Sequence, residues 1–207
     1  MYCDTIQPAN QTCVKCAKIL GHYFCSVCKF WDNDLSKEIF HCEQCRLCRI
    51  GKREDYFHCV KCNACISNNM IKGHKCIERN LESDCPICGE FMFTSVHPVI
   101  FMPCGHGLHE KCHRDHIKNS YQCPICCKSL ADMTAYFRRL DKFLESHVMP
   151  DEYASWMSVI LCNDCELKSN AAYHFLYHKC QSCGSYNTKV TDVIKPDQKG
   201  DASAMET

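Results

Sequence analysis

The chain has 207 residues, 23 of them cysteine, and its 24 basic residues balance its 24 acidic residues. So many cysteines favour either a disulfide scaffold or a zinc protein, and zero net charge argues against a nucleic-acid partner bound mainly through phosphates. No apolar run approaches the roughly 20 residues that a membrane helix needs, so we expect a soluble protein with no membrane partner.

Three features favour zinc over disulfides. Most cysteines come as C-x2-C pairs, which bridge each other with difficulty but are well placed to hold one metal ion. Histidines recur at fixed offsets from these cysteines. The start of the chain, MYCDTIQPAN, lacks the apolar stretch of a secretory signal, so we expect a reducing location, in the nucleus and the cytoplasm.

Modules of this size bury too little apolar surface to fold alone. Metal binding supplies the missing free energy, about 10–16 kcal/mol for each structural zinc site. The first group of candidate ligands, Cys3, Cys13 and Cys16, is one short of a tetrahedral site. The fourth ligand is either His22 or a residue that would precede Met1.

A unit of seventeen residues then repeats, because Cys25, Cys42, Cys59 and Cys76 are equally spaced. Such a period indicates stacked copies of one unit, with metal in place of a hydrophobic core. The repeat offers twelve ligands, enough for three zinc ions: Cys25, Cys28, His41, Cys42, Cys45, Cys48, His58, Cys59, Cys62, Cys65, His74 and Cys76. Interleaved and sequential pairings fit equally well. The aromatic-bearing runs at 21–25, 38–42 and 55–59 predict short strands.

Basic residues gather within this repeat at Arg46, Arg49, Lys52 and Arg53, followed at once by two acidic residues. We interpret this local cluster as a solvated face rather than a nucleic-acid contact.

Eight further ligands follow the pattern C-x2-C, C-x-H-x2-H-x2-C, C-x2-C, which is that of a RING finger of the Cys/His type. They are Cys85, Cys88, Cys104, His106, His109, Cys112, Cys123 and Cys126. Eight ligands make two four-ligand zinc sites with no open position for water, so both are structural. Residues 110–119 are expected to form a short helix after the central ligands.

The resemblance to RING fingers implies more than the spacing does. It implies a cross-brace, with Cys85, Cys88, His109 and Cys112 on one zinc and Cys104, His106, Cys123 and Cys126 on the other. It also implies a docking groove for a ubiquitin-conjugating enzyme, formed here by Ile87, by Ile117 or its neighbour His116, and by Pro124 with Ile125 beside it. Many related RINGs place Arg or Lys directly after the last ligand. Here Cys127 stands there, so Lys128 substitutes for it or other parts of the chain position ubiquitin.

Apolar side chains at helical spacing predict a helix over 133–146, interpreted as a connecting helix packed on a neighbour. Two more pairs, Cys162 with Cys165 and Cys180 with Cys183, then predict a zinc ribbon; a rubredoxin-like iron site is conceivable but less suited to a RING neighbour. A strand is expected over 171–177, with His174 and His178 as surface or packing residues. From 192 onward the polar composition predicts disorder.

Taken in order, these parts resemble the CHY-type zinc finger and RING finger ubiquitin ligases over nearly the whole chain. The resemblance rests on long runs such as HCEQCRLCRIGKREDYFHC, MPCGHGLHEKC, YQCPIC and ILCNDCELKSNAAYHFLYHKC. It implies that a CHY finger is only partly present, so the missing first ligand would fall before Met1, and that the zinc-rich flanks help to recognise substrates.

The expected fold is therefore a small zinc-stabilised multi-module protein, irregular with short strands and helices: a zinc repeat spiral, a cross-brace RING and a zinc ribbon. The expected modules are a CHY remnant at 1–24, a three-zinc CTCHY repeat at 25–80, a RING at 81–130, a helical linker at 131–158, a rubredoxin-like ribbon at 159–191 and a disordered tail at 192–207.

We expect six complete zinc sites and one incomplete N-terminal site. The expected function is that of a RING-type ubiquitin-protein ligase, with a conjugating enzyme, ubiquitin and a protein substrate as partners; that substrate could be a transcription factor, and its fate would be proteasomal degradation. No residue of the chain would carry ubiquitin covalently. The alternatives are a non-catalytic zinc scaffold or transcription cofactor and a nucleic-acid-binding zinc protein, the last disfavoured by the charge balance.

Overall fold

The structure, a computed structural model, describes residues 3–196. The chain forms two compact units, one comprising the residues up to Phe101 with Gly105–Lys111, the other comprising Met102–Cys104 with the residues from Cys112 onward. Its strands are short and its helices few, and its Cys and His side chains gather in clusters. The expected fold class is thereby confirmed. Within residues 3–196, no helix has the length and apolar character needed to cross a bilayer.

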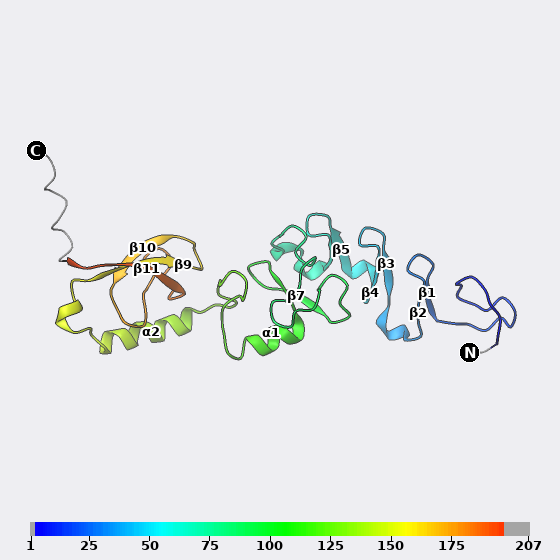
Figure 1. The fold of residues 1–207 in the computed structure, drawn as a ribbon, viewed down its shortest axis with the longest axis horizontal. Helices are drawn as coiled ribbons and strands as arrows, with labels where there is room; N and C mark the ends of the chain where they lie inside the picture. The colour runs from blue at the N-terminus through cyan, green and yellow to red at the C-terminus, as the bar shows by residue number, and fades with distance from the viewer. Residues whose placement is uncertain (1–2, 197–207) are drawn as a thin grey trace, which may run out of the picture. The chain divides into compact units, whose positions relative to one another are not determined.

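Three antiparallel hairpins follow one another in the first unit (Figure 1). They pair β1 (Tyr23–Cys25) with β2 (Phe30–Asp32), β3 (Phe40–Cys42) with β4 (Leu47–Arg49), and β5 (Tyr56–Cys59) with β6 (Ala64–Ser67). The first strand of each lies in one of the aromatic-bearing runs that predicted strands. Three 3-10 turns accompany the hairpins: η1 (Leu35–Lys37), η2 (Arg53–Asp55) and η3 (Asn68–Gly73).

One tight turn recurs after eight C-x2-C pairs of the chain, although not after the overlapping spacings Cys45–Cys48 and Cys62–Cys65. The residue directly after the second cysteine has a left-handed backbone, with φ between 50° and 76°, in all eight cases: Ala17, Lys29, Arg46, Asn63, Gly89, Cys127, Glu166 and Gly184. In the last RING pair, for example, the amide of Cys127 donates to the carbonyl of Cys123 over 2.9 Å. This turn brings both sulfurs of a pair to the same side, where they can hold one ion.

Small apolar clusters pack beside the sulfurs of the repeat. One contains Phe40, Cys42 and Cys45, the other Cys62, Ala64, Ile66 and Leu81. Phe93 packs against both clusters, so the start of the RING region is joined to the repeat within the first unit.

Arg49 departs from the solvated face expected for the basic cluster. Its guanidinium lies over the Phe93 ring, 5.1 Å from the ring centre, and donates to the Phe93 carbonyl over 3.0 Å. The planar, weakly hydrated guanidinium can stack on an aromatic ring, and that contact removes Arg49 from the solvent-facing set.

The RING region contributes β7 (Val99–Phe101), paired with β8 (Gly107–His109), and then α1 (Glu110–His116). The helix ends three residues before the predicted end at 119. The amides of Asn119 and Ser120 both donate to the carbonyl of His116, so the chain turns there instead of continuing the helix.

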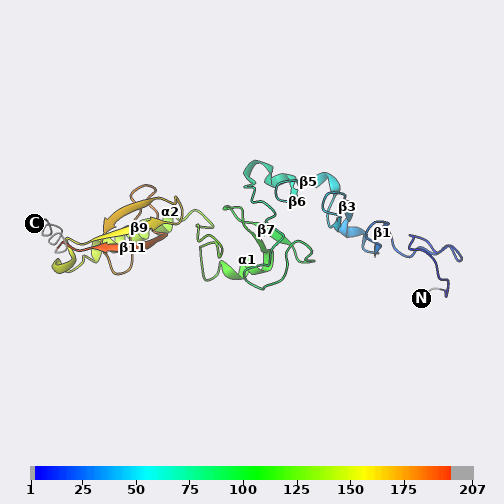
Figure 2. The same cartoon turned by 45° about the horizontal axis from the view of Figure 1, so that its top comes forward.

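The second unit holds a three-stranded antiparallel sheet in the order β10, β9, β11 (Figures 1 and 2). These strands are β9 (Met157–Cys162), β10 (Lys168–Ala172) and β11 (Thr188–Ile194). The prediction of a strand over 171–177 is wrong in position. Pairing begins as the chain leaves the Cys165 turn, and His174 Nδ1 then accepts the amides of Leu176 and Tyr177, which bends the chain away.

The predicted start of a disordered tail at 192 is also wrong. Strand β11 continues to Ile194, which pairs with Met157 at the start of β9, and a bulge between Val190 and Asp192 absorbs the change of register. The polar composition of the residues after 194 led to a predicted boundary that lies too early in the chain. The part of that tail from 197 to 207 lies outside the described residues.

The predicted connecting helix is α2 (Thr134–Ser146), followed by a 3-10 turn, η4 (Asp151–Tyr153). It belongs to the ribbon rather than to a linker. Asp141 accepts hydrogen bonds from Lys179 (2.6 Å) and from the hydroxyl of the largely buried Tyr186 (2.7 Å). Phe137 also packs on the Tyr186 ring. The helix therefore contacts the ribbon segment that carries Cys180 and Cys183, through hydrogen bonds to Lys179 and Tyr186 and a ring contact with Tyr186.

Candidate metal centres

Five groups of four Cys and His side chains converge so that all ligand atoms of a group lie within 4.8 Å of one another. Three belong to the repeat: Cys25, Cys28, His41 and Cys48; Cys42, Cys45, His58 and Cys65; Cys59, Cys62, His74 and Cys76. Two belong to the RING region: Cys85, Cys88, His109 and Cys112; Cys104, His106, Cys123 and Cys126. Two more groups of at least three potential ligands are present among the described residues.

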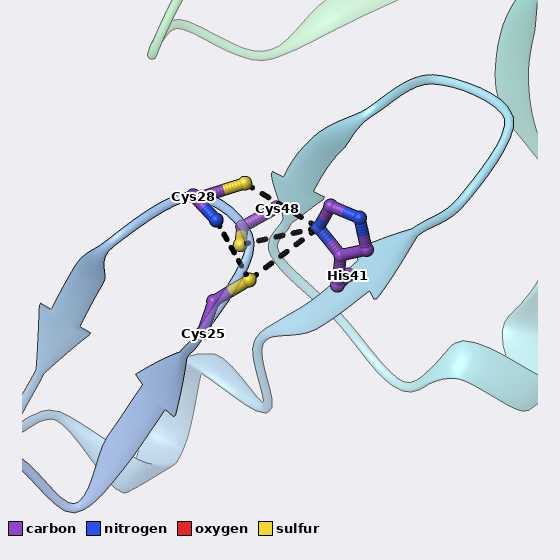
Figure 3. Close-up of side chains that lie close together, drawn as sticks. All are labelled: Cys25, Cys28, His41 and Cys48. Carbon is purple, nitrogen blue, oxygen red and sulfur yellow. Dashed lines mark hydrogen bonds between the residues drawn. The ribbon is translucent and has the colours of Figure 1, made fainter. Parts of the chain in front are cut away.

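The first group shows how neighbouring hairpins build one site (Figure 3). Cys25 is the last residue of β1 and Cys28 lies in the turn after it, whereas His41 comes from β3 and Cys48 from β4. The His41 Nδ1 atom lies 3.5, 3.4 and 3.9 Å from the three sulfurs of Cys25, Cys28 and Cys48. A tetrahedron with zinc–sulfur bonds near 2.3 Å and zinc–nitrogen bonds near 2.1 Å has edges of about 3.5–3.8 Å. The group fits zinc.

The pKa values of the cysteine thiols also indicate a bound cation. A hydrogen bond from Cys65 lowers the pKa of Cys45 to about 4, and the same contact raises the pKa of Cys65. Burial raises the pKa of Cys85, but hydrogen bonds from the backbone amides of Cys88, His109 and Ile87 outweigh that effect and bring the pKa to about 6. Without a metal ion, ionisation of the Cys45 sulfur therefore disfavours ionisation of the Cys65 sulfur. A zinc ion stabilises every sulfur of the group as thiolate.

The grouping resolves the pairing that the seventeen-residue period left open. Ligands interleave: each site takes its C-x2-C pair from one hairpin and its remaining two ligands from the next segment of the chain. Each zinc therefore joins successive segments of the repeat. In the RING region, the two groups are the same two sets that the cross-brace of the resemblance implies.

The ribbon cysteines also converge. The sulfurs of Cys162 and Cys183 lie 3.6 Å apart, as do those of Cys165 and Cys180. Neither ribbon histidine is needed as a ligand: His178 is buried and shares a hydrogen bond of 2.9 Å with the Ser158 hydroxyl. Zinc is accordingly the cofactor that the clusters of this chain fit.

Near the start of the chain, the sulfur of Cys3 lies 3.5 Å from that of Cys13 and 3.6 Å from that of Cys16. The three predicted ligands are thus together. The His22 side chain is exposed, and its backbone amide donates to Asn33 Oδ1 over 3.3 Å.

The residues expected to dock a conjugating enzyme are accessible. Ile87 is 45% exposed and Ile117 is 49% exposed, whereas Pro124 is half-buried beside the exposed Ile125. The alternative to Ile117, His116, is half-buried, and its Nε2 lies 2.7 Å from the Gln122 carbonyl. Ile117 is therefore the better-placed apolar residue of the two.

Sequence reasoning missed a polar network in the second unit, built on Asp164 and Asn187. Burial raises the pKa of Asp164, but hydrogen bonds from Ser185, Ser129 and Asn187 outweigh it and hold the pKa below its ordinary value. Lys128, the expected substitute for the basic residue after the last RING ligand, instead lies 3.0 Å from the Glu166 carboxylate. No spacing rule reports such contacts, because their partners are far apart in sequence.

Comparison with known proteins agrees with this geometry. The Ring finger domain family matches residues 83–127, and the Zinc-ribbon family matches residues 131–189, which include α2. The rice (Oryza sativa subsp. japonica) protein named E3 ubiquitin-protein ligase SRFP1 is 40% identical over 191 residues, which cover 91% of this chain and 72% of that protein. The chain belongs to the same family as this rice protein.

Other members of the family are longer. An uncharacterized RING finger protein of Schizosaccharomyces pombe is 46% identical over 95% of this chain, and a BRUTUS-like zinc finger protein of Arabidopsis thaliana is 52% identical over 92%. This chain spans 47% of the first and 15% of the second. The part shared across the family thus includes the repeat, the RING and the ribbon.

Proposed function

We propose that this chain acts as a RING-type ubiquitin-protein ligase. The observation that carries the proposal is the pair of four-ligand groups in the RING region beside exposed apolar side chains at Ile87 and Ile117. Relatives named E3 ubiquitin-protein ligase, in Arabidopsis and rice, support it.

In this proposal, the chain performs no bond chemistry of its own. Zinc, when bound, supplies structural cross-links with closed coordination. The chain's residues then act on the conjugating enzyme, whose cysteine carries ubiquitin as a thioester. Ile87, Ile117 and Pro124 form its docking surface. Docking holds the thioester in an orientation that favours attack by a substrate lysine, which accelerates transfer through positioning.

Two finer assignments accompany this proposal. Residues 1–24 correspond to the last part of a CHY-type finger and 25–80 to the CTCHY repeat, with the zinc-rich flanks presenting a protein substrate for degradation. The protein works in the nucleus and cytoplasm, as its dependence on reduced thiols requires. Fractionation of cells that express the tagged chain tests the location, and a purely secreted product would refute it.

The test is autoubiquitination with a panel of conjugating enzymes. The wild-type chain forms ubiquitin chains with at least one of them, and Ile87→Ala lowers that activity by about 30-fold, as loss of an interface hot spot does. Zinc content by native mass spectrometry stays unchanged, because Ile87 is no ligand. Zinc loss from this variant would make the residue structural instead.

Val27→Ala is the matched control. Val27 occupies the same place in its own pair, Cys25-Ser26-Val27-Cys28, and is 63% exposed, but lies in the repeat. The Val27→Ala variant keeps full activity. A folded, zinc-loaded wild-type chain that is inactive with the whole panel favours the alternative of a non-catalytic zinc scaffold, which Cys127 in the usual basic position also favours.

A further inference from the structure

The segment that follows the last RING ligand, Cys127 to Ser129, is held by side chains of the zinc ribbon. Asn187 donates from Nδ2 to the Cys127 carbonyl over 2.7 Å. Asp164 accepts the Ser129 amide over 2.7 Å and the Ser129 hydroxyl over 2.9 Å. All these residues lie in the second unit, although Cys127 ends the Ring finger match, Asp164 and Asn187 belong to the Zinc-ribbon match, and Ser129 lies between the two matches.

The other side of the same RING turn is held as well. Gln122, which pairs with Ser129 in an isolated β-bridge, donates from Nε2 to Asn187 Oδ1 over 2.6 Å. The residues on both sides of the Cys123–Cys126 pair, Gln122 and Cys127, therefore form hydrogen bonds with the same ribbon side chain. Asn187 is only 1% exposed, and its amide uses both its donor and its acceptor atoms. A buried polar group with this many partners fixes one geometry, because any other arrangement leaves donors or acceptors unpaired.

Asp164 is itself fixed within the ribbon. It lies between two zinc ligands, Cys162 and Cys165, and also accepts the Ser185 hydroxyl over 2.7 Å. The Lys128 side chain, between the two anchored residues, pairs with Glu166 of the same ribbon turn. The ribbon thus restrains all three residues of the segment, through backbone or side chain.

We infer that Asp164 and Asn187 are positioning residues for ubiquitin transfer, which hold the Cys127–Ser129 segment against the ribbon in the place where related RINGs carry a basic residue. This inference rests on the proposed ligase function. It means that the ribbon contributes to ubiquitin transfer and does not only bind the substrate. A rigid segment next to the docking surface lowers the entropic barrier to holding the thioester in its reactive orientation.

The experiment uses the full chain and a conjugating enzyme charged with ubiquitin, with free lysine as acceptor, so that no protein substrate takes part. Asp164→Asn keeps the shape of the side chain but places an amide against donors. Gln122→Met removes the contact from the RING side and leaves the ribbon unaltered. Ser158→Ala is the control, because it deletes a buried ribbon hydrogen bond, to His178, that is remote in the contact network from the RING segment.

Asp164→Asn slows discharge by about tenfold at saturating conjugating enzyme, as expected for loss of hydrogen bonds to a charged group. Its affinity for that enzyme and its zinc content stay at wild-type values. Gln122→Met slows discharge by a smaller factor, and Ser158→Ala leaves it unchanged. Discharge at the wild-type rate by Asp164→Asn overturns the inference, and so does a loss of activity that only follows a loss of zinc.

Hydrogen exchange separates failure of the inference from failure of the ligase function. In Asp164→Asn, amides of 127–130 exchange faster while those of the repeat do not change, whatever the catalytic activity. An inactive wild-type chain would refute the ligase function, whereas unchanged exchange at 127–130 would refute the restraint itself.

Discussion

The repeat and the ribbon both depend on C-x2-C turns, but they stabilise their strands differently. The strands of the repeat have three or four residues, and their small apolar clusters include metal ligands, Cys62 in one and Cys42 with Cys45 in the other. The strands of the ribbon have five to seven residues and bury Ile160 and Ala171, with Tyr186 packed under α2. Metal replaces the core in one region and supplements it in the other.

This difference arises from how the ligands are distributed. In the repeat every zinc takes ligands from successive segments, so each ion is also the joint between two hairpins. In the ribbon the two pairs lie at the base of one sheet, where backbone pairing, a helix and the Asp164–Asn187 network add further contacts. The comparison predicts a large difference in how each region responds to loss of metal.

Removing zinc with a chelator produces the largest effect. Residues 25–76 lose all protection from hydrogen exchange, because each site contributes about 10–16 kcal/mol that nothing else replaces. Amides of β9, next to the buried Ile160, keep part of their protection. The measurement is exchange mass spectrometry across the chain before and after chelation.

Re-addition of zinc, but not magnesium, restores the pattern and serves as the control, since thiolate sites select zinc. If the repeat and the ribbon both lost all protection, the ribbon would depend on zinc as fully as the repeat does, which would contradict the comparison.

Removing one buried ligand from each region has an intermediate effect. Cys62→Ser and Cys180→Ser both replace sulfurs that are at most 1% exposed, and each variant loses one zinc by native mass spectrometry. Cys62→Ser unfolds the β5–β6 hairpin as well, because its apolar cluster includes that sulfur. Cys180→Ser leaves β9 paired.

Cys127→Ser provides the matched control for both, since this exposed cysteine belongs to none of the five four-ligand groups described above. It retains every zinc. Preservation of the β5–β6 hairpin in Cys62→Ser would show that the repeat has a core independent of its metal.

The sequence predicted the ligands well because zinc imposes its spacing locally: a C-x2-C pair holds an ion only through one kind of turn. It could not predict the interleaving, because the seventeen-residue period repeats the same ligand spacings in every unit. His41 and Cys48 could therefore share a zinc with Cys25 or with ligands of another unit, and the spacing does not decide between them. It also misplaced β10, and it set the start of a disordered tail inside β11, because the register of both strands depends on pairing with β9 rather than on the composition near Asp192. The contacts of Asn187 depend on the folded chain in the same way.

The turn that both regions share allows the smallest test. Arg46 in the repeat and Gly184 in the ribbon hold the same left-handed position, with φ of 55° and 73°. A residue with a Cβ atom is disfavoured there by about 1–2 kcal/mol, partly offset by the greater freedom of glycine in the unfolded chain. Arg46→Gly therefore stabilises the repeat, and Gly184→Ala destabilises the ribbon, each by about 1 kcal/mol.

Thermal unfolding of the zinc-loaded variants measures both changes. A Cβ atom at Gly184 would meet nothing nearer than 3.7 Å, the Lys179 side chain, so crowding cannot explain a loss there. Arg46→Ala is the control: it removes the same exposed side chain but keeps the Cβ atom, and it leaves stability close to that of the wild type. If Arg46→Ala stabilised the repeat as much as Arg46→Gly, the gain would come from removing the charge and not from relieving the backbone.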